Sequence, residues 1–464
     1  MEAYDVVFIG GGPGGYVGAI RAAQRGARVA VIERDELGGV CLNRGCIPTK
    51  SLIASVEALR TARRLDQFGI TLDSEPVPSL KAMHDRRKKI VQNLVRGIGA
   101  LFKGHRIRLI KGEGILLARD RIGVKGADGE IEIGARNVVL ASGSRPAMIP
   151  GLEPDGVKVL TSDDLLQRDI IPGRLLVIGA GAIGCEWACI YSALGAKVTV
   201  VEMLDRLLPL EDEEIAGVLE REFRKQKIAF KLGAKIAALE RGGEGVKAVL
   251  ESGDEVEADW ALVSVGRACN TDKLGLENVG IAPGKGGRIE VNEKMETVTP
   301  GIYAVGDIAT GGPMLAHVAS AEGIVAAENI TGANRKLDLS ATPSCTFTHP
   351  EVASVGLKES DAKKSGMEYK VGRFDFRVLG KAQAMGDIAG EVKVVAADSG
   401  MILGVHMIGH AVSDLIHEGV IAVKYKLTVE QLAEAIHAHP TLAEGMVEAA
   451  EDVTGNAIHV APKK

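Results

Sequence analysis

Aromatic side chains are scarce in this chain of 464 residues, in which Phe, Tyr and Trp together make up 3% of the sequence. Glycine is abundant instead, with 58 residues, and this balance is typical of proteins with many tight strand-to-helix turns. A strong charge of either sign is also lacking, because the formal net charge is −5 and the charged residues are dispersed. The sequence therefore carries no basic patch for a nucleic acid or another polyanion.

Long hydrophobic runs are absent as well, so we expect no helix that crosses a bilayer. A strand-like stretch already begins at Tyr4, which leaves no room for a signal or transit peptide, and we expect a cytoplasmic protein. A cleaved organellar presequence outside the given sequence is compatible with the same pattern. The length suffices for about three domains, and the hydrophobic content of 46% supports well-developed cores.

Two of the six cysteines lie close together, in the stretch Gly38-Gly-Val-Cys-Leu-Asn-Arg-Gly-Cys-Ile-Pro-Thr-Lys50. In a regular helix their Cα atoms would be about 8.6 Å apart, which exceeds the roughly 7 Å that a disulphide tolerates. Cys41 and Cys46 can therefore form a disulphide only if a helix begins between them, as Gly45 permits and Pro48 favours. Cys46 then lies at a helix N-terminus, where the helix dipole stabilises a thiolate.

A close cysteine pair in a reduced compartment is more typical of catalysis or metal binding than of a structural cross-link. Lys50 follows Cys46 by four residues, so on a helix it adds positive charge to the same face. Taken alone, the C-x4-C spacing also fits two small buried residues or half of a zinc site. Because no neighbouring residues complete a tetrahedral set of ligands, we predict no metal site.

An apolar strand from Tyr4 runs into a G-x-G-x-x-G turn, a helical stretch follows, and a second strand ends in an acid. This order is the one that a dinucleotide-binding βαβ unit needs: glycines admit a pyrophosphate, the helix N-terminus receives its charge, and the acid binds a ribose. The predicted binding residues of this first unit are Gly10, Gly12, Gly15 and Glu33.

The same pattern recurs later in the chain, with Gly179, Gly181, Gly184 and Glu202. In both copies the acid lies 23 residues after the first glycine, and the segments 9–33 and 178–202 match at 10 of 25 positions without gaps. Two dinucleotide sites and a cysteine pair indicate electron transfer between FAD, NAD(P) and a thiol couple. Glu202 favours NAD over NADP, because its carboxylate would repel a 2′-phosphate.

Further strands also end in glycine turns, at Ser142-Gly143, at Gly266 and at Gly306-Asp307. The set of motifs is extended by Pro313-Met-Leu-Ala-His317, Thr348-His-Pro-Glu351 and His437-Ala-His-Pro-Thr441. Together these motifs span nearly the whole chain and closely resemble the pyridine nucleotide-disulphide oxidoreductases, and within them the dihydrolipoamide dehydrogenase branch.

The resemblance implies an α/β fold with two Rossmann-like domains, for FAD and NAD, and a C-terminal α+β dimerisation domain. We expect an FAD-binding domain at 1–148, an NAD-binding domain at 149–269, a central segment at 270–340 that completes the FAD site, and an interface domain at 341–464. It implies that FAD is bound by Gly10, Gly12, Gly15, Glu33, Lys50 and Asp307, and NAD by Gly179, Gly181, Gly184 and Glu202. Further expected cofactor contacts are Ser142, Gly143, Glu186, Gly266, Ala316 and His317.

A proton acceptor is needed, because thiol-disulphide exchange proceeds through a thiolate. Our candidate is His439, with Glu444 five residues on to bind the other imidazole nitrogen. The resemblance assigns both, and implies that they face the disulphide of the partner subunit in a homodimer. We expect His84, His105 and His437 to be structural.

The implied reaction is oxidation of dihydrolipoyl groups by NAD through Cys41 and Cys46, with Cys41 contacting the substrate and Cys46 the flavin. Implied partners are lipoyl domains and the acyltransferase core of 2-oxoacid dehydrogenase complexes, or the glycine cleavage system. A glutathione-type reductase is disfavoured because no arginine cluster follows Glu202, and mercuric reductase because the C-terminus has no cysteine pair. A non-catalytic flavoprotein that serves as a binding subunit is the alternative of a different class.

The chain departs from the family pattern at three positions. Val40 and Ser142 replace the usual Thr, and Cys269 replaces a Pro, which alters a turn and not the chemistry. Cys185 and Cys189 lie four residues apart on the helix after the second fingerprint, and we expect them to pack against the sheet rather than to form a second redox pair. Cys345 has no partner in the sequence.

Overall fold

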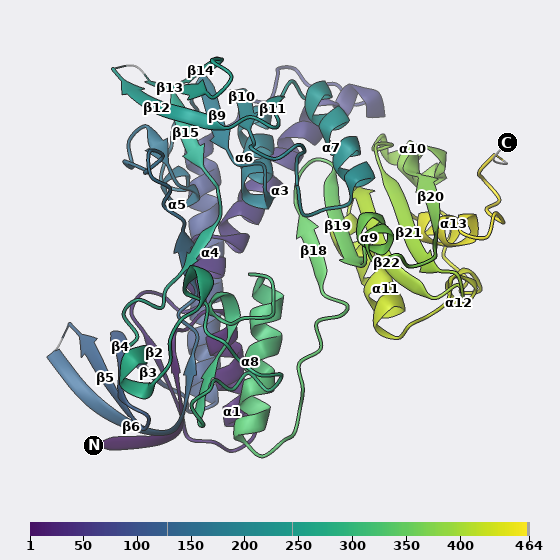
Figure 1. Ribbon diagram of the computed structural model, residues 1–464. Coiled ribbons are helices and arrows are strands. Elements are labelled where there is room, and N and C mark those ends of the chain that lie inside the picture. The colour runs from purple at the N-terminus through teal and green to yellow at the C-terminus, as the bar shows by residue number, and fades with distance from the viewer. Residues whose placement is uncertain (128, 244, 462–464) are drawn as a thin grey trace. The chain divides into compact units, whose positions relative to one another are not determined.

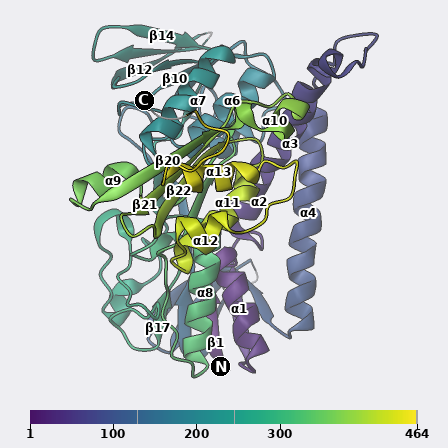
Figure 2. The same ribbon diagram turned by 90° about the vertical axis from the view of Figure 1, so that its right-hand side faces the viewer.

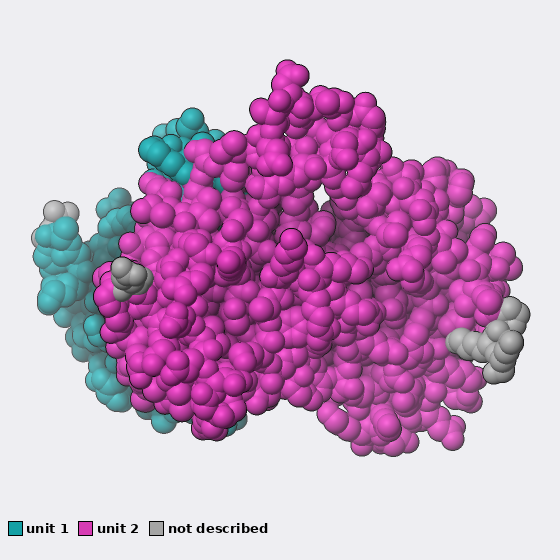
Figure 3. Space-filling view, turned by 90° about the horizontal axis from the view of Figure 1, so that it is seen from above, with its two compact units in different colours: residues 1–52, 81–148, 266–339 teal, residues 53–80, 149–265, 340–464 magenta. Residues whose placement is uncertain are grey.

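The computed structural model describes residues 1–127, 129–243 and 245–461, and these form two compact units (Figure 1). Unit 1 contains residues 1–52, 81–148 and 266–339, and unit 2 contains residues 53–80, 149–265 and 340–464. Figure 3 colours unit 1 teal and unit 2 magenta. Each unit is therefore assembled from segments that are far apart in the sequence.

Unit 1 is built on a seven-stranded sheet in the order β3-β2-β1-β6-β5-β4, with β17 paired to β6. Strands β1, β2, β3, β6 and β17 run parallel, whereas β4, β5 and β6 form an antiparallel meander. The bounds are β1(Glu2–Ile9), β2(Val29–Glu33), β3(Arg108–Lys111), β4(Glu113–Ala118), β5(Arg121–Gly126), β6(Gly129–Leu140) and β17(Ile302–Ala304). A separate ribbon pairs β7(Ser144–Pro146) with β16(Arg267–Cys269).

Two helices pack against each other beside this sheet, α1(Pro13–Gln24) and α8(Ala316–Ile330), and the two views show them side by side (Figures 1 and 2). Their buried faces include many small residues, such as Gly18, Ala19, Ala22 and Ala326. Small side chains let the two backbones approach closely. The other elements of this unit are α2(Gly39–Asn43), most of α4(Leu80–Gly104), η2(Leu276–Val279), η3(Lys285–Gly287) and η4(Gly306–Ile308).

Unit 2 contains a second parallel sheet, in the order β11-β10-β9-β15-β8. Its bounds are β8(Val159–Leu160), β9(Arg174–Ile178), β10(Lys197–Val201), β11(Ala229–Lys231) and β15(Trp260–Val263), with α5(Ser162–Leu165), α6(Ala182–Ala193) and α7(Glu213–Lys225). A small antiparallel sheet consists of β12(Ile236–Gly242), β13(Gly245–Leu250) and β14(Glu255–Ala258). In unit 1, β1 lies between β2 and β6, and in unit 2, β9 lies between β10 and β15, so each sheet has the strand-order reversal at which nucleotides bind.

The C-terminal part of unit 2 is an antiparallel sheet in the order β18-β19-β22-β21-β20. The strands are β18(Pro343–Thr346), β19(Glu351–Gly356), β20(Tyr369–Asp375), β21(Glu391–Ala397) and β22(Ile402–Gly409). Its helices are α9(Glu359–Lys364), α10(Gly380–Met385), α11(Val412–Lys424), α12(Val429–Ala433) and α13(Glu444–Asp452), with η5(Phe376–Val378). A single core of buried Val, Ile, Met, Phe and Ala side chains joins this sheet to α11 and α13.

Helix α3(Cys46–Arg63) belongs to both units, since its first residues are in unit 1 and the rest, followed by η1(Leu65–Phe68), are in unit 2. The two parallel sheets and the C-terminal α+β sheet agree with the fold class that the sequence predicts. Among the described residues, no helix is both long and apolar enough to cross a membrane.

Candidate functional site

The first glycine turn brings the end of β1 against the start of α1. Gly10 has a φ of 112°, and a Cβ atom there would lie 2.2 Å from the Ala141 carbonyl oxygen. A Cβ atom on Gly15 would lie 1.9 Å from the Gly10 carbonyl oxygen. Gly12 is the N-cap of α1 and provides no side-chain cap, so the first N–H groups of the helix are not capped by a side chain. A backbone cradle with uncapped helical N–H groups suits an anionic phosphate.

The second glycine turn repeats this geometry between β9 and α6. Gly179 has a φ of 98°, and its Cβ atom would lie 2.6 Å from the carbonyl oxygen of Ser264. A Cβ atom on Gly184 would lie 2.0 Å from the Gly179 carbonyl oxygen. Gly181 is the N-cap of α6, again without a side-chain cap. Two equivalent glycine turns therefore exist, one in each unit, and the geometry of each suits a phosphate.

The two predicted ribose-binding acids also make equivalent contacts. Glu33 accepts hydrogen bonds from the backbone N–H groups of Gly11 and Asp35, both at 2.7 Å. Glu202 accepts from the N–H groups of Ala180 at 2.7 Å and Leu204 at 2.9 Å. Each carboxylate thus supports its own glycine turn. A carboxylate has about four acceptor positions, so each retains capacity for ribose hydroxyls, and the residues present fit FAD in unit 1 and NAD in unit 2.

The cysteine pair lies at a break between two helices. Cys41 is in α2, and α3 begins at Cys46, which confirms that a helix starts between the two residues. A Cβ atom on Gly45 would lie 3.0 Å from the Val40 carbonyl oxygen, so glycine allows the start of α3 to approach α2. Thr49 closes the first turn, since its hydroxyl donates to the Gly45 carbonyl at 2.8 Å. Cys41 is half-buried and Cys46 is exposed.

The two thiols are in hydrogen-bond contact, and this contact changes the pKa of Cys41. The hydrogen bond to Cys46, together with burial, raises the pKa of the Cys41 thiol well above its ordinary value. The ammonium group of Lys50 acts in the opposite direction and lowers the pKa of Cys41. Cys41 is therefore a poor thiolate while it is hydrogen-bonded to Cys46, which makes the two cysteines unequal.

The segment before the cysteines packs directly on the first glycine turn. The N–H of Gly38 donates to the Gly11 carbonyl at 2.8 Å, and a Cβ atom on Gly39 would lie 2.7 Å from the Cα atom of Gly12. This backbone-to-backbone contact explains the two consecutive glycines, both of which have a positive φ. The redox pair is thereby fixed beside the proposed flavin nucleotide cradle.

Asp307, a predicted FAD contact, lies in the turn η4 after β17. Its carboxylate accepts a hydrogen bond from the Ser144 hydroxyl and lies 3.9 Å from the Arg267 guanidinium. Arg267 in turn donates to the Ser144 hydroxyl at 2.6 Å. The thiol of Cys269 donates to the Asp307 carbonyl at 3.3 Å. The sequence did not predict Ser144 and Arg267, because they become neighbours of Asp307 only through the pairing of β17 with β6 and of β7 with β16.

The neighbouring turn at Ser142 and Gly143 is bound to Asn270. The Ser142 hydroxyl donates to the Asn270 carbonyl at 2.8 Å, and the Asn270 N–H donates to the Gly143 carbonyl at 2.9 Å. Gly266 has a φ of 123°, and its carbonyl accepts from the Ala147 N–H. These contacts keep the predicted residues in one connected loop structure.

The remaining predicted contacts lie on helices. Ala316 and His317 form the first turn of α8, which has no side-chain cap. Glu186 lies on α6, is 5% exposed, and accepts a hydrogen bond from the Phe347 N–H at 3.0 Å. A buried carboxylate next to the NAD cradle is compatible with the expected position near a nicotinamide.

The predicted base and its carboxylate are in contact, since His439 Nδ1 lies 2.8 Å from Glu444 Oε1. The other oxygen of Glu444 accepts from the Thr441 N–H at 2.8 Å. The Thr441 N–H and the His439 imidazole hold the pKa of the Glu444 carboxyl below its ordinary value. The His439 side chain is 77% exposed, so its ring projects from the surface of the chain. This arrangement can orient an imidazole for proton transfer.

Two other histidines form similar pairs. His437, which we expected to be structural, lies 2.7 Å from Glu418 and has a side chain that is 12% exposed. His459, which the sequence did not single out, lies 2.6 Å from Glu448. Glu448, the partner of His459, lies four residues after Glu444, the partner of His439, so both glutamates lie on the same face of α13. This spacing is the sequence signal that could have indicated His459.

The remaining cysteines are packing residues. Cys185 and Cys189 are both buried in α6, as expected, and burial raises the pKa of each thiol, for Cys189 to about 11. Cys269 is buried and Cys345 is half-buried. Among the described residues, no group of His, Cys, Asp and Glu is arranged to bind a metal ion.

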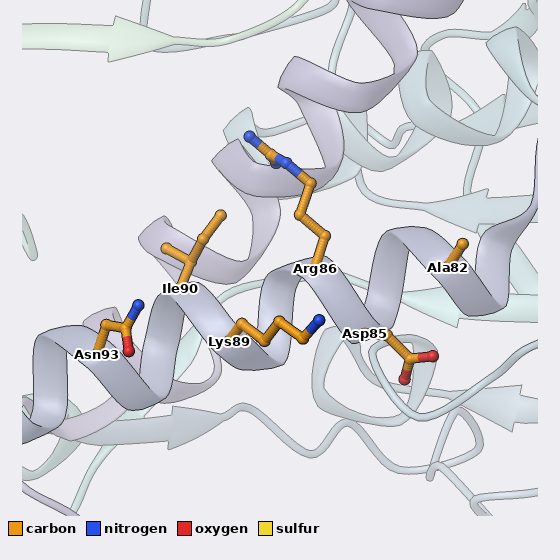
Figure 4. A pocket seen from close by; sticks show the side chains of 6 residues that line it. All are labelled: Ala82, Asp85, Arg86, Lys89, Ile90 and Asn93. Carbon is orange, nitrogen blue, oxygen red and sulfur yellow. The ribbon is translucent and has the colours of Figure 1, made fainter.

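An open groove on α4 is a separate feature of unit 1 (Figure 4). Arg86 points from this groove toward α3 and donates to the carbonyl and hydroxyl of Ser51. The groove is lined by Ala82, Asp85, Arg86, Lys89, Ile90 and Asn93. None of the predicted catalytic or cofactor-binding residues is among these lining residues, so the groove is not the candidate active site.

Comparison with known proteins agrees with this geometry. Residues 4–323 match the family model of the pyridine nucleotide-disulphide oxidoreductases, and residues 342–450 match the dimerisation domain of the same family. The chain is 43% identical to a dihydrolipoyl dehydrogenase of Bacillus subtilis, over 98% of this chain and 99% of the relative. It is 40% identical to a dihydrolipoyl dehydrogenase of Chlamydia pneumoniae, over 100% of this chain and 99% of the relative.

A solved structure has the same fold over nearly the whole length. The crystal structure of LpdA from Mycobacterium tuberculosis superimposes with a TM-score of 0.90 at 33% identity, over 97% of this chain and 99% of that chain. The expected fold class, the enzyme class and the two cofactors, FAD and NAD, are thereby confirmed. The chain belongs to the pyridine nucleotide-disulphide oxidoreductase family and groups with its dihydrolipoyl dehydrogenases.

Proposed function

We propose that this protein oxidises dihydrolipoyl groups to lipoyl disulphides and that the electrons pass through Cys41 and Cys46 to NAD. The observation that carries the proposal is the unequal thiol pair at the start of α3, fixed by backbone contact to the first glycine turn. FAD, when bound, supplies the two-electron acceptor that reoxidises the cysteine pair and transfers hydride to NAD.

The chain's own residues account for the thiol chemistry. With the pair as a disulphide, His439 accepts the proton of one substrate thiol, and the thiolate attacks the sulphur of Cys41. The Cys41–Cys46 bond breaks, and Cys46 leaves as a thiolate at the N-terminus of α3, where the helix dipole stabilises it. The second substrate thiol loses its proton and attacks the sulphur bound to Cys41, which releases the lipoyl disulphide and leaves the pair reduced by two electrons.

We assign His439 and Glu444 to the base because the carboxylate fixes the ring through Nδ1 and leaves Nε2 as the proton-accepting nitrogen. Both residues lie in the segment that matches the dimerisation domain. We therefore propose a homodimer in which this pair serves the cysteines of the other subunit. We also propose an FAD-binding domain at 1–148, an NAD-binding domain at 149–269, a central segment at 270–340 and an interface domain at 341–464.

For NAD, we propose that Gly179, Gly181 and Gly184 receive the pyrophosphate and that Glu202 binds the ribose. Glu202 is buried, and a carboxylate at this position would repel a 2′-phosphate, which supports NAD over NADP. We also propose a cytoplasmic location, lipoyl domains as carriers of the substrate, and docking on the acyltransferase core of a 2-oxoacid dehydrogenase complex or service in the glycine cleavage system.

The test is steady-state turnover of the purified holoenzyme with dihydrolipoamide or reduced glutathione, and with NAD or NADP. We expect NADH formation from dihydrolipoamide and NAD, and its loss in Cys46→Ser with flavin still bound. Near-normal turnover in Cys46→Ser would refute the thiol relay. Bound flavin without turnover in the wild-type protein would instead favour the non-catalytic flavoprotein.

A further inference from the structure

Glu322 is a buried carboxyl group that the thiol chemistry does not use. It lies on the inner face of α8 and is 1% exposed. Its Oε2 atom accepts a hydrogen bond from the Gly306 N–H at 2.5 Å, and its Oε1 atom is directed toward Gly312. No ion pair of Glu322 is found among the described residues. A buried acid without a salt bridge is costly, so its presence calls for a specific task.

The group that Glu322 binds is the turn immediately before Asp307. Gly306 has a φ of 75°, a backbone conformation that favours glycine, so the direction of its N–H is set by the turn itself. The side chain of Asp307 is fixed by Ser144 and Arg267, and its carbonyl by the Cys269 thiol. The hydrogen bond from Gly306 to Glu322 fixes the remaining side of the turn.

Helix α8 is itself locked against α1, so Glu322 has little freedom to move. A Cβ atom on Gly323 would lie 2.2 Å from the Gly14 carbonyl oxygen, and one on Gly18 would lie 2.9 Å from the Gly323 carbonyl oxygen. The helices thus touch backbone to backbone at the residue next to Glu322, as the side-by-side position of α1 and α8 shows (Figure 2). Helix α1 begins at the first glycine turn, and Glu322 of α8 binds the turn before Asp307. The contact between α1 and α8 therefore links the two turns.

We propose that Glu322 is a positioning residue for the flavin nucleotide: its carboxyl group fixes the Gly306–Asp307 turn relative to the glycine turn of α1. The inference rests on the proposed assignment of this site to FAD. Glu322 acts through Gly306 and is not a catalytic residue. The charged groups that face it are Asp307 from η4 and Arg288, which follows η3, whereas α1 contributes glycines at the crossing.

The protonation of Glu322 gives the inference a second observable. Burial and the negative charge of Asp307 raise its pKa, whereas the Gly306 N–H and Arg288 lower it, and the result is a pKa of about 7. A bound anionic dinucleotide nearby disfavours the ionised carboxylate and so raises this pKa further. FAD binding then takes up a proton, and by linkage the affinity for FAD falls as the pH rises through 7.

The experiment measures the Kd for FAD of flavin-free protein, by quenching of flavin fluorescence, at pH 6 and pH 8. Glu322→Leu leaves the Gly306 N–H without its acceptor, and we expect a Kd raised about 10-fold or more. Glu322→Gln keeps an acceptor oxygen, so it should bind FAD like the wild type at pH 6. Its Kd should also stay the same at pH 8, where that of the wild type rises. Glu277→Leu, at an exposed glutamate of η2 in the same unit, is the control and should bind like the wild type.

An unchanged Kd in Glu322→Leu overturns the inference. If that variant does not fold, as judged by its circular dichroism, the Gln variant decides: a pH dependence equal to that of the wild type overturns the inference. Activity is not part of this test. The FAD affinities can therefore support the role of Glu322 even if dihydrolipoamide is not the substrate, and wild-type protein without FAD binding would refute the flavin assignment first.

Discussion

Replacing His439 with Gln removes the proposed proton acceptor and little else. The ring is held by one hydrogen bond of 2.8 Å to Glu444, and the side chain is 77% exposed, so few packing contacts are lost. A positioned general base contributes about 10²- to 10⁴-fold in rate, which corresponds to about 3 to 5 kcal/mol of activation free energy. We expect kcat with dihydrolipoamide to decrease by about 10²- to 10⁴-fold. The flavin content and the unfolding temperature should stay at wild-type values.

The assay is NADH formation at saturating dihydrolipoamide between pH 6 and pH 9, with the flavin absorbance as a measure of bound cofactor. Glu444, whose pKa is lowered by the Thr441 N–H and by His439, stays charged over this range, so a change of turnover with pH does not arise from this carboxylate. His437→Gln is the matched control, because His437 also contacts a glutamate, Glu418, and lies two residues away. A His439→Gln variant within threefold of wild-type turnover, or an equal loss in both variants, would refute the assignment of the base.

Two further predictions concern stability and NAD binding. Lys393→Met removes the ammonium group that pairs with the buried Asp212 at 3.0 Å, and should destabilise the protein by about 3–5 kcal/mol at pH 7. In the wild type, burial raises the pKa of Asp212 but Lys393 more than offsets this, so the net shift is downward and the pair stabilises the fold above the ordinary pKa of Asp. In the Lys393→Met variant, burial raises the pKa of Asp212, so this carboxyl becomes protonated and neutral as the pH approaches 4. The destabilisation of the variant should therefore be smaller at low pH. An equal decrease of the urea-unfolding midpoint at pH 7 and pH 4.5 would contradict this. Gly184→Ala places a methyl group 2.0 Å from the Gly179 carbonyl oxygen and should raise the KM for NAD about 10-fold or more with FAD content unchanged. In the control Gly217→Ala the added methyl group meets only the Arg221 side chain, at 3.9 Å, and should leave both quantities unchanged. An unaltered KM in Gly184→Ala would show that the turn is not the NAD site.

Much of the site could be predicted from the sequence because its residues are close together along the chain. The distance argument for Cys41 and Cys46 required a helix to begin between them, and α3 begins at Cys46. The repeated spacing from glycine to acid predicted two equivalent turns, and Glu33 and Glu202 make the same pair of backbone contacts. Such features depend on local backbone geometry, which is encoded within about 25 residues.

Other features became visible only in three dimensions. Ser144 and Asp307 are 163 positions apart, yet they are hydrogen-bonded because β17, which precedes Asp307, pairs with β6, which precedes Ser144. Glu322 belongs to none of the sequence motifs, and its importance follows from its burial and from the contact of α1 with α8 at their glycines. Lys393 reads as an ordinary strand residue, but in the structure it is 1% exposed and pairs with three carboxylates.

The sequence by itself determined the two nucleotide turns, the position of the cysteine pair relative to a helix start, and the contact of His439 with Glu444, since each depends on residues that are near one another along the chain. The tertiary structure alone decided which groups fix Asp307, how α8 is locked to α1, and which carboxylates surround Lys393. These contacts join strands and helices from distant parts of the chain, and sequence spacing carries no information about the atoms that such packing brings within hydrogen-bond distance.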